Sequence, residues 1–130
     1  MSREYIAHGR DRANTIKSQI FNYDNGAGVT IDETLLVPRK QIKLLAARMV
    51  EDTETAGTVA AGSIGLGITV GGVEIVAATN YVNTSTVGTV LNLTILKPII
   101  PGGTPIIARH TGVAATAAGQ GHVELEYMEF

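Results

Sequence analysis

The chain has 130 residues and no cysteine, and 45% of its residues are hydrophobic while only 5% are aromatic. A chain of this length suits one domain with a core of its own and is short for two. Its net charge of −2 gives the whole molecule no basic balance for nucleic acid, and the lack of cysteine excludes disulfides and thiol chemistry.

The charge is unevenly distributed along the chain. Residues 1–48 carry eight lysines and arginines against five acids, whereas residues 49–130 carry two against seven. A basic front and an acidic back suit a protein that touches charged neighbours, although two differently solvated faces would give the same distribution. No apolar run approaches the roughly 20 residues of a membrane helix, and no signal peptide is visible, so we expect neither membrane insertion nor secretion.

Residues 1–28 are predicted to form an N-terminal arm that leads into the folded domain. Aromatic and apolar side chains are scattered among charges here, and Asp24-Asn25-Gly26 predicts a turn at the boundary. The arm could pack on its own domain, as termini often do. The alternative is an arm that is disordered in the free protein and orders over a partner. On that hypothesis the candidate contacts to a partner or a neighbouring subunit are Tyr5, Arg10, Arg12, Phe21 and Tyr23.

Residues 29–130 are predicted to be the β domain, and Val29–Val37 is its first strand, ended by Pro38. The segment Gln41–Glu51 fits either a helix or a strand. We favour a strand because Pro38 closely precedes the segment and its neighbours are β. A regular strand would place Leu45, Ala47 and Met49 on one face.

Thr58–Val70 is predicted to be a long or bent strand. Gly65 and Gly67 leave one of its faces without side chains, which permits another backbone to approach closely. We therefore expect homo-oligomerisation through the β domain. The following segment, Val73–Val82, could be a short helix or an edge strand, and the sequence does not decide between them.

The centre of the prediction is an antiparallel hairpin. Its strands are Val90–Leu96 and Ile106–His110, joined across a turn at Pro101-Gly102-Gly103. The closing strand, His122–Phe130, has the cleanest alternation in the chain.

About seven strands separated by Gly, Pro and Asn turns indicate an all-β fold, a jelly-roll-like β-sandwich with an extended N-terminal arm. The predicted core comprises apolar residues from most of these strands. They are Leu36, Leu45, Ile64, Leu66, Ile68, Leu91, Leu93, Ile95, Val123 and Leu125.

Residues able to carry chemistry do not converge in the sequence. Metal binding would require His110, His122 and an acid such as Glu124 to meet, and the histidines lack ligand spacing. His122 and Glu124 share a face of one strand, but we expect that face to be solvated. Ser63 lacks the flanking glycine pattern of a nucleophile elbow. Because no catalytic or ligating set of residues converges, we expect no enzymatic activity, no metal and no cofactor.

Two charged clusters remain. Glu51, Asp52 and Glu54 lie together in a predicted turn, where we expect them to be solvated. Arg39-Lys40 and Lys43 form a basic cluster without interleaved aromatic residues, which gives weak support for nucleic-acid binding.

From Val29 onward the order of segments resembles the jelly-roll cement (head decoration) proteins of tailed bacteriophage capsids. The segments that carry the resemblance are Leu36-Val37-Pro38, Lys43–Arg48, Gly72–Thr79, Val87–Val90, Leu93-Thr94-Ile95, Pro101–Pro105, Arg109–Gly112 and Val123–Tyr127.

The resemblance implies a structural protein that catalyses no reaction. Many copies, as symmetric dimers or trimers, would bind the major capsid protein outside the shell and clamp neighbouring subunits, often with an N-terminal arm. The protein would be made in the host cytoplasm and reside on the virion exterior, with neither nucleic acid nor membrane as a partner. The alternative is a phage tail or host-recognition module with a carbohydrate-binding β-sandwich, since fold does not fix function.

Overall fold

The computed structural model describes residues 13–22, 26, 28–53, 62–81, 86–112 and 119–130, and all regular structure in them is β-strand. The strands in chain order are β1 (Asn14–Lys17), β2 (Phe21–Asn22), β3 (Thr30–Leu36), β4 (Ile42–Glu51), β5 (Ser63–Gly67), β6 (Val76–Asn80), β7 (Val90–Leu93), β8 (Ile99–Ile100), β9 (Ile106–Thr111) and β10 (Gln120–Glu129).

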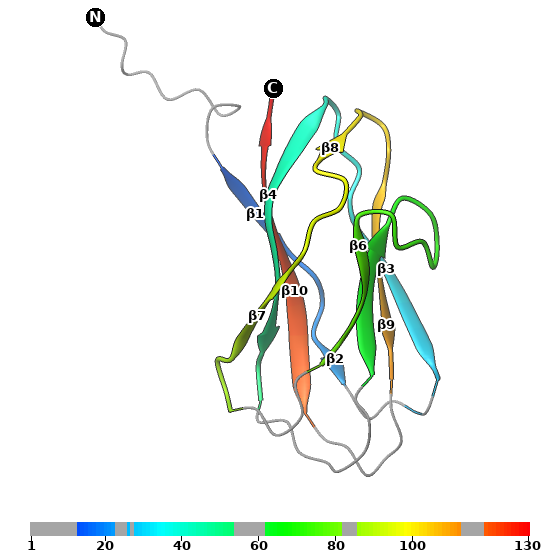
Figure 1. Cartoon of the computed structure of the whole chain (residues 1–130), viewed down its shortest axis with the longest axis vertical. Helices are drawn as coiled ribbons and strands as arrows, with labels where there is room; N and C mark the ends of the chain where they lie inside the picture. The colour runs from blue at the N-terminus through cyan, green and yellow to red at the C-terminus, as the bar shows by residue number, and fades with distance from the viewer. Residues whose placement is uncertain (1–12, 23–25, 27, 54–61, 82–85, 113–118) are drawn as a thin grey trace, which may run out of the picture.

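The strands form two sheets that face each other, as Figure 1 shows. The first sheet has the order β1-β10-β4-β7, with β2 pairing β10 and β8 pairing β4; the second has the order β3-β9-β5-β6. Every pairing is antiparallel. The predicted all-β, jelly-roll-like β-sandwich is therefore confirmed.

Both segments that could have been helices are strands. The Gln41–Glu51 segment contains β4, and Val73–Val82 contains the shorter strand β6. β4 is a central strand, paired with β10 on one side and with β7 and β8 on the other. Its apolar side chains gain more from burial in the sandwich than helix propensity could offer.

The predicted hairpin is wrong in its pairing. Both strands exist, but β7 pairs β4 in the first sheet while β9 pairs β3 and β5 in the second. The turn at Pro101-Gly102-Gly103 thus belongs to a crossover between sheets. There it contacts the end of the preceding segment, where Gly103 N donates to Pro38 O at 2.7 Å.

Two β-bulges change which residues face the core. In β4, Ala46 pairs Glu126 and Leu44 pairs Tyr127, so Leu45 is the extra residue. In β3, Thr34 and Leu36 pair Ile107 and Ile106, which leaves Leu35 as the extra residue. A bulge shifts the alternation of side chains by one position within a strand.

The core confirms most of the predicted residues and corrects one. Ile64, Leu66, Leu93, Val123 and Leu125 are buried, and Leu36, Ile68, Leu91 and Ile95 pack against the core while partly exposed. Leu45 is 41% exposed, and the bulge gives the core position to Leu44. Burial also takes in residues that were not predicted: Phe21, Leu35, Tyr81, His110 and Glu51.

Part of the predicted arm belongs to the sandwich. Within the range 1–28, β1 pairs β10 from Asn14↔Tyr127 to Lys17↔Glu124, and β2 pairs β10 at its other end. Phe21 is 2% exposed, so β2 contributes a core side chain. These strands gain their hydrogen bonds from the long edge of β10, which propensity within residues 13–22 cannot reveal.

The close backbone approach predicted at Gly65 and Gly67 occurs within the chain itself. The segment after β5 folds back over it, and a Cβ atom on Gly67 would overlap the carbonyl group of Gly72. A Cβ atom on Gly65 would lie 3.1 Å from Cγ1 of Val73. Since both glycines are buried, they offer no bare strip to a second copy. Homo-oligomerisation stays a prediction that these glycines do not support.

Candidate functional site

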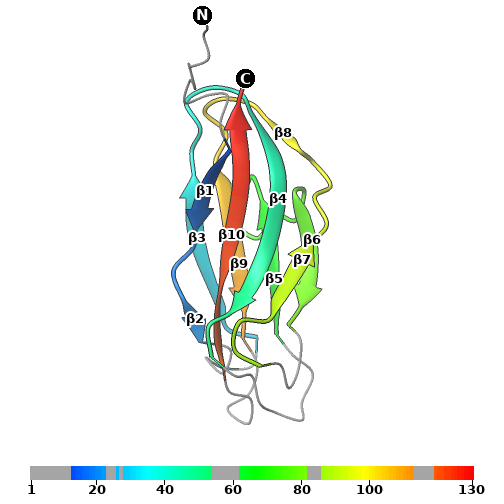
Figure 2. The same cartoon turned by 90° about the vertical axis from the view of Figure 1, so that its left-hand side faces the viewer.

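The outer face of the first sheet carries two different surfaces. Figure 2 views this face directly, with β10 and β4 running along its middle. Across β1, β10 and β4 lies a charged cluster, defined as Lys17, Arg48, Asp52, His122, Glu124 and Glu126. Towards the end of the sheet where the C-terminus lies is an apolar patch, defined as Lys43, Leu45, Ile99, Met128 and Phe130.

Glu124 is the centre of the charged cluster. Its carboxylate lies 3.7 Å from Lys17 Nζ on β1 and 3.1 Å from Arg48 Nε on β4, so it connects three neighbouring strands. Hydrogen bonding from His122, together with that from Arg48, outweighs burial and lowers the pKa of Glu124. The carboxylate is therefore ionised and neutralised by its own domain at neutral pH.

His122 bridges two carboxylates and is more enclosed than the sequence suggested. Its Nδ1 lies 2.6 Å from Asp52 Oδ2 and its Nε2 lies 2.8 Å from Glu124 Oε2, with 11% of the side chain exposed. Burial lowers the pKa of His122, but the hydrogen bonds to Glu124 and Asp52 outweigh it, so the net shift is upward. Both ring nitrogens are engaged by carboxylates, which leaves neither available to a substrate.

The predicted solvated cluster of acids is therefore corrected in part. Asp52 pairs with His122, and Glu51, at the end of β4, is 2% exposed. Glu54 lies outside the described residues. Within the part of the chain that the structure describes, no three His, Cys, Asp or Glu residues are grouped to hold a metal ion.

The apolar patch follows from strand register. Lys43 pairs both Met128 on β10 and Ile99 on β8, so these three side chains share a face. Their neighbours Ile42 and Ile100 are fully buried, which places Lys43 and Ile99 on the outside. The bulge turns Leu45 to this outer face as well.

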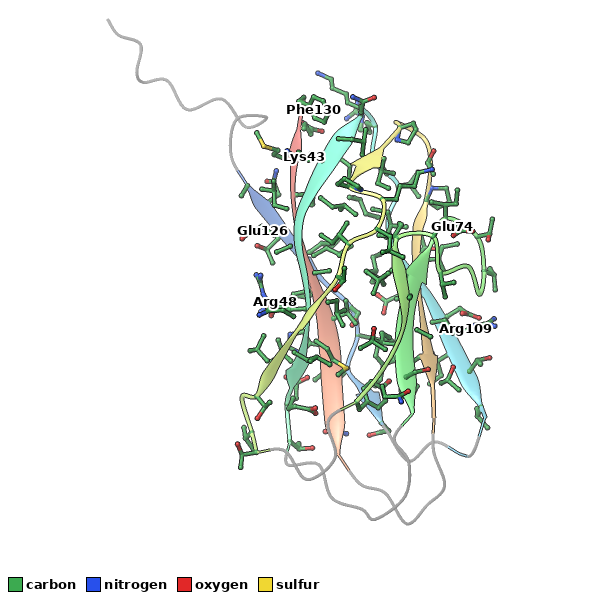
Figure 3. All side chains as sticks on the ribbon, viewed as in Figure 1. Lys43, Arg48, Glu74, Arg109, Glu126 and Phe130 are labelled. Atoms are coloured by element: carbon green, nitrogen blue, oxygen red, sulfur yellow. The ribbon has the colours of Figure 1, made fainter. Side chains whose placement is uncertain are left out.

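Phe130 completes the apolar patch beyond the end of β10. Its backbone N donates to Gln41 O at 3.2 Å, and its side chain is 55% exposed. Figure 3 labels Phe130 and Lys43 near this end of the molecule, with Glu126 and Arg48 further along the sheet. An open hollow lined by Arg39, Lys40 and Glu129 lies at the same end.

The outer face of the second sheet is partly closed by the chain itself. Arg109 on β9 holds Asp32 on β3 through two hydrogen bonds, Nε–Oδ1 at 2.8 Å and Nη2–Oδ2 at 2.9 Å. The hydrogen bonds from Arg109 lower the pKa of Asp32 despite some burial. The side chain of Glu74 accepts from the backbone N of Ile68 at 3.0 Å, which fastens the segment over β5.

His110 is part of the core. Its ring stacks on Phe21, with centroids 5.0 Å apart and planes 2° from parallel, and on Tyr81 at 5.4 Å. The Tyr81 hydroxyl is hydrogen-bonded to His110 Nδ1. Burial lowers the pKa of His110 to about 4, against a smaller upward effect of a hydrogen bond with the backbone of Asn22. The neutral imidazole is a structural element that ties β2 to β9.

Of the five residues predicted to be contacts of the arm, the structure describes one. Phe21 is buried against its own domain and is not an exposed anchor for a partner, which corrects that prediction. Tyr5, Arg10, Arg12 and Tyr23 lie outside the described residues. No helix in the described residues is long and apolar enough to cross a membrane.

The described aromatic side chains bear on the carbohydrate-binding alternative. Phe21 and Tyr81 are buried, and Tyr127 is partly covered. Among the described aromatic residues, this leaves Phe130 as the one with a largely exposed ring. A flat aromatic platform for sugar rings is therefore not present in this part of the molecule.

Comparison with known proteins gives a likeness of fold. The structure is similar to a chain of the capsid asymmetric unit of cyanophage Pam1, with a TM-score of 0.61 and 12% sequence identity. The likeness covers 91% of this chain and 85% of that chain. No protein-family model and no curated protein matches the sequence.

Proposed function

We propose that this chain is a structural protein of a bacteriophage virion that binds the outside of the major capsid shell and clamps neighbouring capsid subunits together. The observation that carries the proposal is the fold shared with a chain of a phage capsid asymmetric unit, over most of the length of both chains. The segments that resemble cement proteins support the same assignment from the sequence.

The surface chemistry suits a protein that binds and does not catalyse. The charged cluster neutralises itself through the contacts of Glu124 with Lys17, Arg48 and His122, so it leaves no base or acid aimed at a substrate. The apolar patch presents area that a partner could cover. An exposed apolar area beside polar residues is typical of protein interaction sites.

Cosedimentation with capsid shells tests the proposal. The shells would be assembled from the major capsid protein encoded in the same genome, and increasing amounts of the full chain would be added. We expect pelleting to saturate at a fixed ratio to the capsid subunits, with a higher temperature of shell rupture when sites are filled. If the protein stays in the supernatant at all ratios, the capsid assignment is wrong.

The same preparation tests the host-recognition alternative. A glycan array probed with the full chain is expected to be blank if the protein acts on the capsid alone. Specific glycan binding without shell binding would replace the proposal with a carbohydrate-recognition function. Light scattering of the free protein measures whether clamping uses dimers, trimers or single copies.

A further inference from the structure

The apolar patch is an uncovered part of the first sheet's outer face. Phe130 is 55% exposed, Leu45 41% and Ile99 38%, and register places them around Lys43. Leu45 faces outward because of the β4 bulge, without which a regular strand would turn this leucine towards the core. Bulges often re-aim side chains beside functional sites.

Cations without an acidic partner among the described residues lie within the apolar patch and at the same end of the sheet. Arg39, Lys40 and Lys43 make no ion pair with any residue in the described ranges. Glu129 is the described acid that lines the same hollow as Arg39 and Lys40. Further along the same face, Lys17 and Arg48 are both paired with Glu124, so within the described part of this face the cations without an ion pair lie at the end that carries the apolar patch.

Strand β1 begins at the same end of the sheet. Asn14, the first residue of β1, pairs Tyr127 near the C-terminal end of β10. The preceding segment, residues 1–12, has three arginines against Glu4 and Asp11. A positively charged segment is a poor electrostatic match for a patch already bordered by unpaired cations. An acidic partner would be a favourable electrostatic match both for residues 1–12 and for the cations at the apolar patch.

We propose that the apolar patch, with Arg39 and Lys40 at its rim, is the surface by which this domain docks on the major capsid protein. This inference rests on the proposed function and names the partner's chemistry: apolar side chains flanked by Asp or Glu carboxylates. Leu45 and Phe130 enter the apolar part of the contact. Lys43, Arg39 and Lys40 meet the carboxylates, which steer association and fix the orientation.

Charge-bearing substitutions in the apolar patch provide the test by cosedimentation with the same capsid shells. Leu45→Glu is matched by Val87→Glu, because Val87 is 65% exposed and precedes β7, away from the apolar patch. Lys43→Glu is matched by Lys97→Glu, another exposed lysine. We expect each apolar-patch variant to weaken shell binding by about tenfold or more, as buried interface residues do, while the matched variants bind as the unchanged protein does.

Thiol labelling identifies what covers the apolar patch, because a chain without cysteine gains a single thiol in Leu45→Cys or Val87→Cys. In free protein we expect both thiols to react readily. On shells we expect labelling to slow strongly at position 45 and to be unchanged at position 87.

Each other outcome overturns the inference in a distinct way. Protection of position 45 in free protein that disappears when residues 1–12 are deleted would mean that the chain's own segment covers the apolar patch. Protection that rises with protein concentration alone would make a second copy the occupant. If the unchanged protein binds shells and Leu45→Glu binds equally well, docking uses another face. If the unchanged protein itself does not bind shells, the proposed function is wrong.

Discussion

At the scale of single residues, His122 links two carboxylates on the outer face of the first sheet, and its protonation sets the sign of those contacts. Its pKa is raised in the folded state, against burial, by hydrogen bonds to Glu124 and Asp52. A group with a raised folded pKa stabilises the fold fully below its unfolded pKa, and that stabilisation is lost as pH rises through the folded pKa.

We therefore predict that His122→Gln removes stability that depends on pH. The stability difference between the unchanged protein and this variant should be largest at about pH 5–6, below the ordinary histidine pKa and above that of the carboxylates. It should shrink as pH rises above the ordinary value of 6.5. Urea unfolding at a series of pH values measures the difference, and a difference that grows towards pH 9 would contradict the assigned contacts.

His110 has the opposite dependence. Because burial lowers its pKa to about 4, the neutral imidazole stabilises the fold above its unfolded value of 6.5, and the effect fades as pH falls towards the folded pKa. We predict that the titration of His110 lowers the free energy of unfolding by at most about 3 kcal/mol between pH 6.5 and pH 4. The variant His110→Phe cannot titrate, so its unfolding free energy should change less over that range, whatever its value at neutral pH.

At the scale of elements, the short strand β2 contributes one buried side chain, Phe21, to the core. We predict that Phe21→Ala lowers the unfolding free energy by about 3–5 kcal/mol, the usual cost of removing a buried aromatic ring. The neighbouring Ile20 is 57% exposed, so Ile20→Ala is the matched control and should change stability by about 0.5 kcal/mol or less. Equal effects at the two positions would mean that β2 does not pack as described.

The close approach of the Gly72 backbone to Gly67 on β5 leads to a second prediction at this scale. Gly67→Ala would force apart Gly67 and the carbonyl of Gly72, whereas Gly65→Ala meets a side-chain methyl of Val73 at 3.1 Å, which can give way. We expect Gly67→Ala to cost about 1–3 kcal/mol and Gly65→Ala less. Chemical unfolding of both variants measures the order, and a more damaging Gly65→Ala would contradict it.

How far the sequence predicts this structure depends on whether the deciding contact is local. The alternation of Val123, Glu124 and Leu125 indicated the closing strand correctly, because a single strand carries its own period of two. The exposure of Leu45 was not predictable in this way, because a bulge is defined only against a partner strand.

The same limit applies to the site. That His122 and Glu124 share a face follows from their spacing, but the approach of Asp52 depends on the register of β4 with β10. The predicted hairpin failed for a similar reason. Strand patterns do not state which sheet a strand joins, and β7 and β9 joined different ones.

At the scale of the whole molecule, the two outer faces of the sandwich differ in how far the chain itself covers them. The second sheet is partly covered by its own segment over β5 and by the Asp32–Arg109 pair. The first sheet leaves apolar side chains exposed at the end where the C-terminus lies, together with cations that form no ion pair with any described residue. Figure 3 labels Phe130 and Lys43 at this end. A protein with one covered face and one open end is suited to sitting on a larger surface through that end.

We propose that this domain sits on the outside of a capsid shell and joins neighbouring subunits through its apolar patch. Electron cryomicroscopy of shells saturated with the full chain, compared with bare shells, tests it most directly. We predict additional density of one β-sandwich per site on the outer surface, with the Leu45 and Phe130 end against a junction between capsid subunits. Shells without added density, or a domain that touches one subunit through the second sheet, would contradict this account.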